Sequence, residues 1–243
     1  MAAHPHRMKI DAALNPAEIA RLPQRNLANV TCVVFDVLRA TSSMITALAS
    51  GALEIHPVAS IEEAHVLHTT LPRAVLGGER KGERIEGFNV GNSPFEYRGM
   101  AGKTIITTTT NGTVALRAVE HAERVLVGAI LNLDALLEEL RWAEPEEVLM
   151  VCAGTFEEFA LEDAWAAGRL IDALPDADLT DSARAAVAIT RLFPNPLDAL
   201  RAARNGRALA AKGRGAEVEW CARVSEFNIV GQMESAVIRP LPQ

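Results

Sequence analysis

The chain has 243 residues, 49% of them hydrophobic and only 5% aromatic, and its formal net charge is −7. This length suits one large domain or two small ones, and a composition rich in Ala, Leu and Val favours an α/β layered protein over a β-sandwich. The negative charge argues against a nucleic-acid partner, and it means that an anionic ligand would need cations placed close to its binding site.

Strand-like and helix-like segments alternate along the first half of the chain. Residues 30–35 (VTCVVF) form a continuous apolar run, which is typical of a strand covered on both faces. A helix is predicted over 40–49, with Thr41 or Ser42 as its N-terminal cap and Gly51 just past its end. The alternation continues with strands at 54–58, 104–108 and 125–129 and helices at 61–71, 113–120 and 133–142.

The pattern changes in the last third of the chain. A buried-type strand at 147–152 and a helix at 161–174 are followed by Ala-rich helical segments. Residues 218–224 fit a helix or a strand, and 236–238 are predicted to form a final edge strand. The helical segments after residue 180 are 181–192, 197–203 and 207–212.

These elements predict the fold class and the domain organisation. Strands that alternate with helices indicate a three-layer α/β/α fold with a mostly parallel or mixed sheet and a helical C-terminal third. No Pro/Ser-rich linker divides the chain. We therefore expect residues 1–243 to form one integrated domain, with a possible sub-boundary near 175–195.

Cysteine use and the N-terminal sequence bear on the compartment. Cys32, Cys152 and Cys221 are far apart and lie beside apolar residues, which favours buried, reduced thiols in a cytosolic protein. Residues 1–10 lack the apolar middle of a signal peptide. We expect a cytoplasmic protein with no membrane partner.

Residues 77–94 (GGERKGERIEGFNVGNSP) form the most informative segment. A polar connection of this length in a compact domain is usually functional or disordered. Ile85, Phe88 and Val90 within it favour a loop held against the body of the protein. We interpret this segment as a functional loop.

Four polar segments directly follow predicted strands: 36–43, 77–94, 107–113 and 153–163. Ligands of open α/β sheets bind outside the carboxyl ends of the strands. If the strands are parallel, the four segments converge on one edge, subject to the strand order.

Asp36 and Arg39 follow the first buried strand. A carboxylate in that position is desolvated unless it is paired or bound to a cation, so Asp36 is either a partner of Arg39 in a structural ion pair or a metal ligand or base, with Arg39 as an anion clamp. The segment is similar to the DxDxT motif of haloacid-dehalogenase phosphatases, but Leu38 occupies the second Asp position and excludes that mechanism.

Two helix starts could bind ions. Residues 107–113 (TTTTNGT) could bind phosphate or carboxylate through free backbone N–H groups, or they could be an ordinary helix start capped by Asn111 or Thr113. They are not a P-loop. Glu162 and Asp163 could complement a helix dipole, or they could bind a hard cation such as Mg²⁺.

The ordered motifs DVLRATS, GERKGERIEGFNVGNSP, TTTTNGT and FALEDAWAAG resemble the 2-phosphosulfolactate phosphatase family. The resemblance spans roughly residues 30–170, with a weaker continuation at 217–222 (EVEWCA). It implies an α/β/α fold and Mg²⁺-dependent hydrolysis of 2-phospho-3-sulfolactate to 3-sulfolactate and phosphate. That reaction is a step of coenzyme M biosynthesis in methanogens.

The chain departs from the family pattern at three places. Asn89 stands where the family usually has Asp, 155–159 (TFEEF) replaces a polar run, and Glu217 stands where Asp is usual. Two alternatives therefore stay open: a phosphatase for a different small phospho-acid, and a non-catalytic protein that binds an anionic phosphorylated or sulfonated metabolite.

The residues and the resemblance together give the candidate site of a small anionic phosphoester. The catalytic candidates are Asp36, Arg39 and Glu79, and Mg²⁺ would be held by some of Asp36, Glu79, Glu162 and Asp163. A homodimer is expected only because it is the commonest assembly. The substrate-binding candidates are Thr41, Ser42, Arg80, Lys81, Arg84, Asn89, Asn92, Ser93, Thr109, Thr110, Asn111, Gly112 and Thr113.

Overall fold

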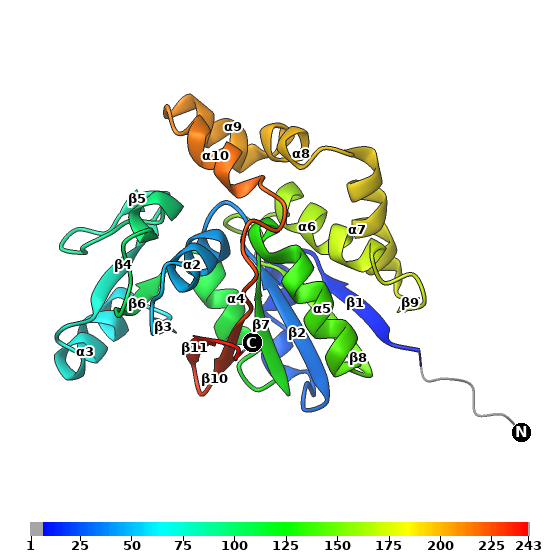
Figure 1. Cartoon of the computed structure of the whole chain (residues 1–243), viewed down its shortest axis with the longest axis horizontal. Helices are drawn as coiled ribbons and strands as arrows, with labels where there is room; N and C mark the ends of the chain where they lie inside the picture. The colour runs from blue at the N-terminus through cyan, green and yellow to red at the C-terminus, as the bar shows by residue number, and fades with distance from the viewer. Residues whose placement is uncertain (1–6, 243) are drawn as a thin grey trace, which may run out of the picture.

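The structure, a computed structural model, describes residues 7–242 (Figure 1). The N-terminal residues 1–6 and Gln243 lie outside the described residues. In the described part of the chain, no helix has the length and apolarity needed to cross a membrane. The compartment expected from the sequence stays a prediction.

A mixed sheet of 11 strands runs through the described residues, with helices on both faces, as expected for a three-layer α/β/α fold. Two runs of parallel strands are joined by an antiparallel hairpin of β10 and β11. The order across the sheet is β5 (Glu83–Arg84), β4 (Val75–Arg80), β6 (Thr104–Thr108), β3 (Glu54–Pro57), β11 (Val237–Pro240), β10 (Gly231–Glu234), β7 (Arg124–Gly128), β2 (Val30–Phe35), β8 (Glu147–Cys152), β1 (Lys9–Ala13) and β9 (Asp178–Leu179).

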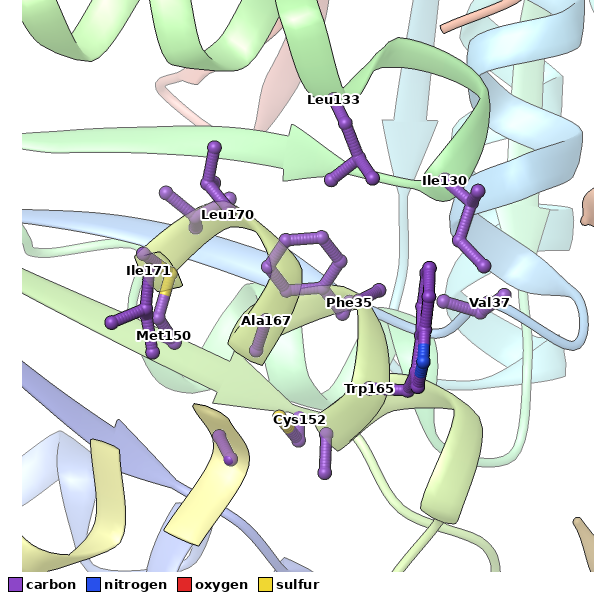
Figure 2. Packing of buried hydrophobic residues seen from close by; sticks show 14 of the residues in the cluster. Phe35, Val37, Ile130, Leu133, Met150, Cys152, Trp165, Ala167, Leu170 and Ile171 are labelled. Atoms are coloured by element: carbon purple, nitrogen blue, oxygen red, sulfur yellow. The ribbon is translucent and has the colours of Figure 1, made fainter. Parts of the chain in front are cut away.

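The central strand β2 is buried along its whole length because helices cover both of its faces. Val33 and Phe35 point into one core, with α5 (Leu133–Ala143), α6 (Leu161–Asp172) and α7 (Asp181–Leu192). Figure 2 shows this core around Phe35 and Trp165. The alternate residues Cys32 and Val34 face the opposite core. That core is covered by α1 (Pro16–Ile19), α2 (Ala40–Ala49) and α4 (Gly112–Ala118).

The sheet curves around α2 and α4. The core beneath these helices contains Val34 and Val127 from one parallel run and Ile55 and Ile105 from the other. Sheets twist by roughly 20–25° per strand pair. The hairpin of β10 and β11 inserts two further strands between the two runs and so increases the twist between them. The two runs point in opposite directions across the hairpin, and both pack the same face against α2 and α4. The residues that follow β2 and β6 nevertheless meet at the starts of these helices, where a Cβ at Gly112 would lie 2.6 Å from Asp36 Oδ2. The outer face of β4 and β6 is covered by α3 (Ile61–Thr70).

The C-terminal third continues from α7 into α8 (Pro196–Ala202), α9 (Arg204–Ala211) and α10 (Gly215–Cys221). In Figure 1, α8, α9 and α10 lie above α6, beyond the carboxyl end of β2. A close approach fixes α7 on α6, since a Cβ at Gly168 would lie 2.1 Å from Ala186 O. Thr190 Oγ1 also donates to Trp165 O at 2.7 Å.

Several sequence predictions need correction. Residue range 218–224, which fitted a helix or a strand, is helical up to Cys221 at the end of α10. Strand β11 is an interior strand between β10 and β3 and not an edge strand. The segment 77–94 is partly regular, because β4 extends to Arg80 and pairs with β5. Strands β1, β9 and β10 and the short 3₁₀ helices Leu22–Gln24, Pro94–Tyr97 and Ile130–Asn132 were not anticipated.

The predicted N-terminal caps of α2 are also wrong, whereas Gly51 lies just past the end of this helix with positive φ, as predicted. The N-cap of α2 is Arg39, without a side-chain cap, and Thr41 and Ser42 lie inside the first turn. Thr41 Oγ1 instead accepts a hydrogen bond from the Asp36 N–H, and Ser42 Oγ donates to Val37 O. Both hydroxyls therefore hold the loop between β2 and α2 in place.

Candidate active site

A cleft with a volume of ≈ 170 Å³ lies where the loops after β2, β4, β6 and β8 meet the C-terminal helices. Asp36 and Arg39 line it from the β2 loop, and Glu79 lines it from the end of β4. The C-terminal side contributes Asn205, Lys212 and Arg214. All four polar segments predicted to converge contribute residues to the cleft, and the C-terminal third forms the remaining wall.

Asp36 occupies the base of this cleft. Its Oδ1 accepts the N–H of Ala40 at 3.1 Å, and its Oδ2 accepts no hydrogen bond from the described residues. Desolvation, together with the charges of Glu79 and Glu162, raises the pKa of Asp36 to about 7, although the backbone hydrogen bond from Ala40 and the charge of Arg39 act against the rise. The free oxygen of Asp36 can therefore bind a cation or take up a proton near neutral pH.

Gly112 makes room for this carboxylate. A Cβ at Gly112 would lie 2.6 Å from both Asp36 Oδ2 and Ala40 Cβ. The glycine of the TTTTNGT segment is thus required by the close packing of the start of α4 against Asp36.

Glu79 is fixed by two backbone donors. Its Oε2 accepts the N–H of Gly82 at 2.6 Å, and its Oε1 accepts the N–H of Thr110 at 2.7 Å. The carboxylate therefore ties the turn after β4 to the threonine loop after β6. Thr110 Oγ1 is buried and has no hydrogen-bond partner. Because buried hydroxyls are usually paired, this atom is available to a ligand oxygen or a water.

Glu162 and Asp163 lie behind the cleft and do not line it. Asp163 accepts the N–H groups of Val37 at 2.8 Å and Gly154 at 3.0 Å, so it joins the loops after β2 and β8. Glu162 Oε1 accepts from Asn205 Nδ2 at 2.6 Å. Desolvation raises the pKa of both carboxyls.

A metal cluster is not preassembled in this region. In residues 7–242, no three His, Cys, Asp or Glu side chains are grouped so that they could hold a metal ion. Asp36 and Glu79 are the two of the four predicted metal ligands that reach the cleft. The ligand role of Glu162 and Asp163 stays a prediction.

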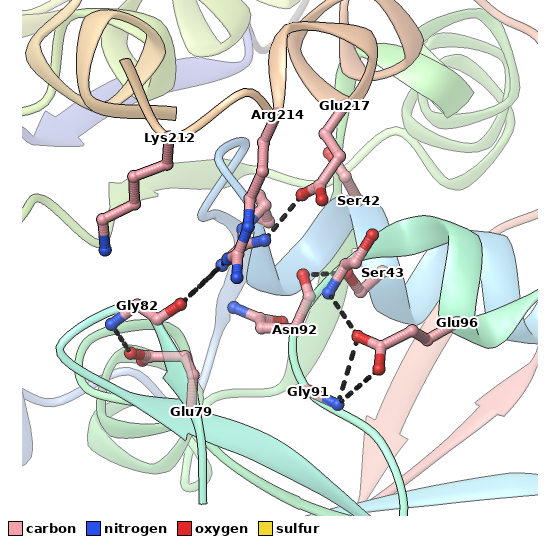
Figure 3. A network of polar contacts seen from close by, with 12 residues as sticks. Ser42, Ser43, Glu79, Gly82, Gly91, Asn92, Glu96, Lys212, Arg214 and Glu217 are labelled. Carbon is pink, nitrogen blue, oxygen red and sulfur yellow. Dashed lines mark hydrogen bonds and ion pairs between the residues drawn. The ribbon is translucent and has the colours of Figure 1, made fainter. Parts of the chain in front are cut away.

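Arg39 is held by a buried partner. Its Nη1 lies 2.6 Å from Glu217 Oε2, and both side chains are shielded from solvent. Its Nη2 donates to Gly82 O at 3.2 Å. The structural ion pair considered between Arg39 and Asp36 is therefore not the one that forms. Figure 3 shows Glu217 on the C-terminal side of this network.

The remaining predicted cations are divided between two places. Lys81 lies at the tip of the two-residue turn between β4 and β5, where Lys81 and Gly82 both have positive φ, and it lines the cleft. Arg80 does not line the cleft, because its guanidinium binds Glu79 O and Thr108 Oγ1. Arg84 also lies outside the cleft and donates to Asn89 O at 3.4 Å.

Two cations of the cleft were not predicted. Lys212 Nζ lies 2.7 Å from Glu83 Oε1, and Arg214 Nη2 lies 3.4 Å from Glu83 Oε2. Arg214 Nη1 also donates to Gly82 O at 3.1 Å, and Figure 3 shows both side chains extending toward this turn. The only signal in the sequence is the pattern KGRG at 212–215, two cations spaced by glycines after a helix.

Most of the predicted polar ligands hold the loops together. Thr109 and Thr113 are buried and exchange hydrogen bonds with each other. Asn111 is at the N-cap position of α4, but its side chain makes no capping hydrogen bond. Its Nδ2 instead donates to Phe156 O, and its Oδ1 accepts from the Phe156 N–H. Among these residues Asn92, Thr110 and Asn111 line the cleft.

Asn89 lies outside the cleft. Its Oδ1 accepts the N–H of Leu76 at 2.8 Å and pins the loop to β4. An Asp oxygen could accept the same hydrogen bond. Because residue 89 does not line the cleft, Asn in place of Asp leaves the charge of the cleft lining unchanged. Ser93 lies in an adjoining hollow that it shares with Arg84, Arg39 and Arg214.

Comparison with known proteins identifies the family of the chain. A model of the 2-phosphosulpholactate phosphatase family matches residues 17–236. The chain belongs to this family. It is a family of phosphatases, and the chain is accordingly a phosphoric monoester hydrolase. The match extends well beyond the resemblance seen in the sequence and includes the C-terminal wall of the cleft.

Curated members of the 2-phosphosulpholactate phosphatase family are similar to almost the whole chain. Each of three relatives carries the name probable 2-phosphosulfolactate phosphatase. The one from Carboxydothermus hydrogenoformans is 39% identical over 92% of both chains. Those from Deinococcus radiodurans and Thermotoga maritima are 37% and 38% identical, over 86% and 85% of this chain and 89% and 90% of their own.

Proposed function

We propose that this protein hydrolyses 2-phospho-3-sulfolactate to 3-sulfolactate and phosphate in an Mg²⁺-dependent reaction. The observation that carries the proposal is one cleft in which two carboxylates, Asp36 and Glu79, face a group of cations in a protein of net charge −7. A strongly anionic phosphoester needs such a local group of cations, because the overall field repels it. The cations of the cleft are Arg39, Lys81, Lys212 and Arg214.

The donor set of the cleft fits Mg²⁺. Mg²⁺ binds oxygen ligands and is usually held by one or two carboxylates together with waters and substrate phosphate. Asp36 has an oxygen without a hydrogen bond, and Glu79 is fixed beside it by backbone donors. Asp36 and Glu79 would hold the ion, and when bound it would neutralise phosphate oxygens and orient a water.

The residues of the chain then bind and orient the substrate. Arg39 presents a guanidinium whose position is fixed by Glu217 and Gly82, and Arg is suited to bidentate contact with oxyanions. The unpaired hydroxyl of Thr110 can donate to a substrate oxygen. These contacts place the phosphate ester against the two carboxylates and hold it there during turnover.

The cleft geometry bears on the alternatives. A different small phospho-acid was considered because of Asn89, but that residue lies outside the cleft, so this departure does not favour another substrate. The use of the product in coenzyme M biosynthesis, a homodimeric assembly and the absence of a nucleic-acid partner stay predictions.

Phosphate release from a panel of phosphomonoesters tests the proposal. We expect 2-phospho-3-sulfolactate to give the highest kcat/KM with Mg²⁺ present, and EDTA to remove the activity. A higher kcat/KM for another phospho-acid would support the alternative substrate. Release at background level for every ester, with 3-sulfolactate still bound, would support the non-catalytic binder. Full activity in EDTA would contradict the metal requirement.

A further inference from the structure

Lys212 and Arg214 share a single carboxylate at the edge of the cleft. Lys212 follows α9, Arg214 precedes α10, and both contact Glu83 of β5. Lys212 and Glu83 are about half exposed, and exposed ion pairs of this kind contribute little to stability. The two cations thus carry one positive charge more than Glu83 balances, and their contact with Glu83 is weak enough to be replaced.

These two cations also face the ligand space. Both line the cleft, and Arg214 together with Arg39 also lines the adjoining hollow. Their present partner is away from the buried carboxylate of the cleft, since Asp36 is buried whereas Glu83 is on the exposed strand β5 and lines the adjoining hollow. A ligand with two separate anionic groups can therefore contact the carboxylate end through one group and Lys212 and Arg214 through the other.

We propose that Lys212 and Arg214 form a subsite for the sulfonate of the substrate, which takes the place of Glu83. This assignment rests on the proposed function. A sulfonate is an ionised group with three acceptor oxygens, Lys offers three donors, and Arg offers five. Charge-assisted hydrogen bonds to such a group are stronger than those between neutral partners. Glu83 acts as an internal competitor that satisfies the two cations when no ligand is bound.

Two substrates separate this subsite from general anion attraction. 2-Phospholactate keeps the phosphate and the carboxylate of 2-phospho-3-sulfolactate but lacks the sulfonate. We expect Lys212→Ala and Arg214→Ala each to raise KM for the sulfonated substrate roughly 10- to 100-fold, as for the loss of a charge-assisted hydrogen bond. KM for 2-phospholactate should rise far less, because the other cations of the cleft still attract its phosphate. An equal rise for both substrates would assign the two cations to the carboxylate or phosphate and overturn the proposal.

A matched control removes a cation that lies away from the cleft. Arg201 on α8 pairs with Glu219 at the surface, and both side chains are more than half exposed. Arg201→Ala changes the net charge by the same amount and should leave both KM values unchanged. A rise in KM with this variant would show that the overall field, and not a local subsite, causes the effect.

Glu83→Gln tests whether Glu83 competes with the sulfonate for the two cations, and it should change KM in the opposite direction to Lys212→Ala and Arg214→Ala. Without the carboxylate, the two cations are free for the sulfonate, so KM for 2-phospho-3-sulfolactate should fall. A structural role for Glu83, as a link between β5 and the C-terminal helices, predicts the reverse. A rise in KM with Glu83→Gln would therefore overturn the proposal.

Calorimetric binding of 3-sulfolactate separates this subsite from the proposed reaction, because it needs no turnover. We expect Arg214→Ala to weaken the binding of 3-sulfolactate and not that of lactate. If the wild-type protein hydrolyses no ester but shows this pattern, the proposed function fails and the subsite stands. If the wild-type protein neither binds 3-sulfolactate nor hydrolyses the sulfonated ester, the subsite is overturned as well.

Discussion

Glu217 and Arg39 form a buried ion pair, with 2.6 Å between Oε2 and Nη1, that joins α10 to the loop after β2. Removing one partner of a buried pair leaves an uncompensated charge and typically costs about 3–5 kcal/mol. We expect Glu217→Ala to lower the free energy of unfolding by about this amount and to lower kcat/KM, because Arg39 loses its fixed position.

The matched variant for Glu217→Ala is Glu219→Ala on the same helix. Glu219 is exposed and pairs only with Arg201, so its removal should change the free energy of unfolding by no more than about 1 kcal/mol. Urea denaturation and steady-state kinetics of both variants provide the comparison. Equal stability of the two variants would show that Glu217 is not an essential partner of Arg39.

Asp36 should be the carboxylate whose loss is most damaging to turnover. Asp36→Asn keeps the shape of the side chain but removes the charge at the base of the cleft, so we expect kcat to fall by at least ~100-fold. We also expect Mg²⁺ to raise the melting temperature of the wild-type protein and not that of Asp36→Asn. The exposed Asp198 of α8 provides a control, since Asp198→Asn should change neither quantity. Near wild-type kcat in folded Asp36→Asn would remove this residue from the reaction.

Gly112 should tolerate no side chain. The Cβ of Gly112→Ala would contact Asp36 Oδ2 and Ala40 Cβ at 2.6 Å, so we expect a loss of stability of about 1–3 kcal/mol from overpacking and a loss of activity. Gly99 offers a control because a Cβ there would have no neighbour within 4 Å. If Gly112→Ala unfolds at the same urea concentration as Gly99→Ala and keeps full activity, the close packing of α4 on Asp36 is not important.

Residues with strong local signals could be predicted from the sequence. The bounds of β2, β8 and α7 could be predicted from the sequence. Each of these segments carries the apolar pattern of its own element, so no information from distant residues is needed to recognise it. The hairpin of β10 and β11 could not be predicted in the same way. Its strands have four residues each, and their position between β7 and β3 depends on pairing with segments more than 100 residues away.

The same distinction applies to the site. Asp36 was predicted because it stands at the end of an apolar strand, where a carboxylate is unexpected. Glu79 was predicted from its place in the polar segment 77–94 and from the family resemblance. Lys212 and Arg214 were missed because nothing local in α9 or α10 indicates that these helices lie over the cleft. Arg80 was assigned to the ligand from its charge alone, whereas alternation along β4 turns its side chain toward Thr108.

The three cysteine thiols should be unreactive in the folded protein. Desolvation raises the pKa of Cys32 and Cys221 to about 12 and that of Cys152 well above its usual value. Because the thiolate is the reactive form, iodoacetamide at pH 8 should label none of the three thiols in the native state and all three in urea. Mass spectrometry gives the count, and native labelling of any thiol at its rate in urea would contradict the burial seen here.

The location of Mg²⁺ and phosphate in a crystal structure of the protein with both bound tests the central claim most directly. We expect the metal between the carboxylates of Asp36 and Glu79, with the phosphate beside it and in contact with Arg39. Metal and phosphate bound at another place, with these three side chains free of ligand, would contradict the assignment of this cleft as the active site.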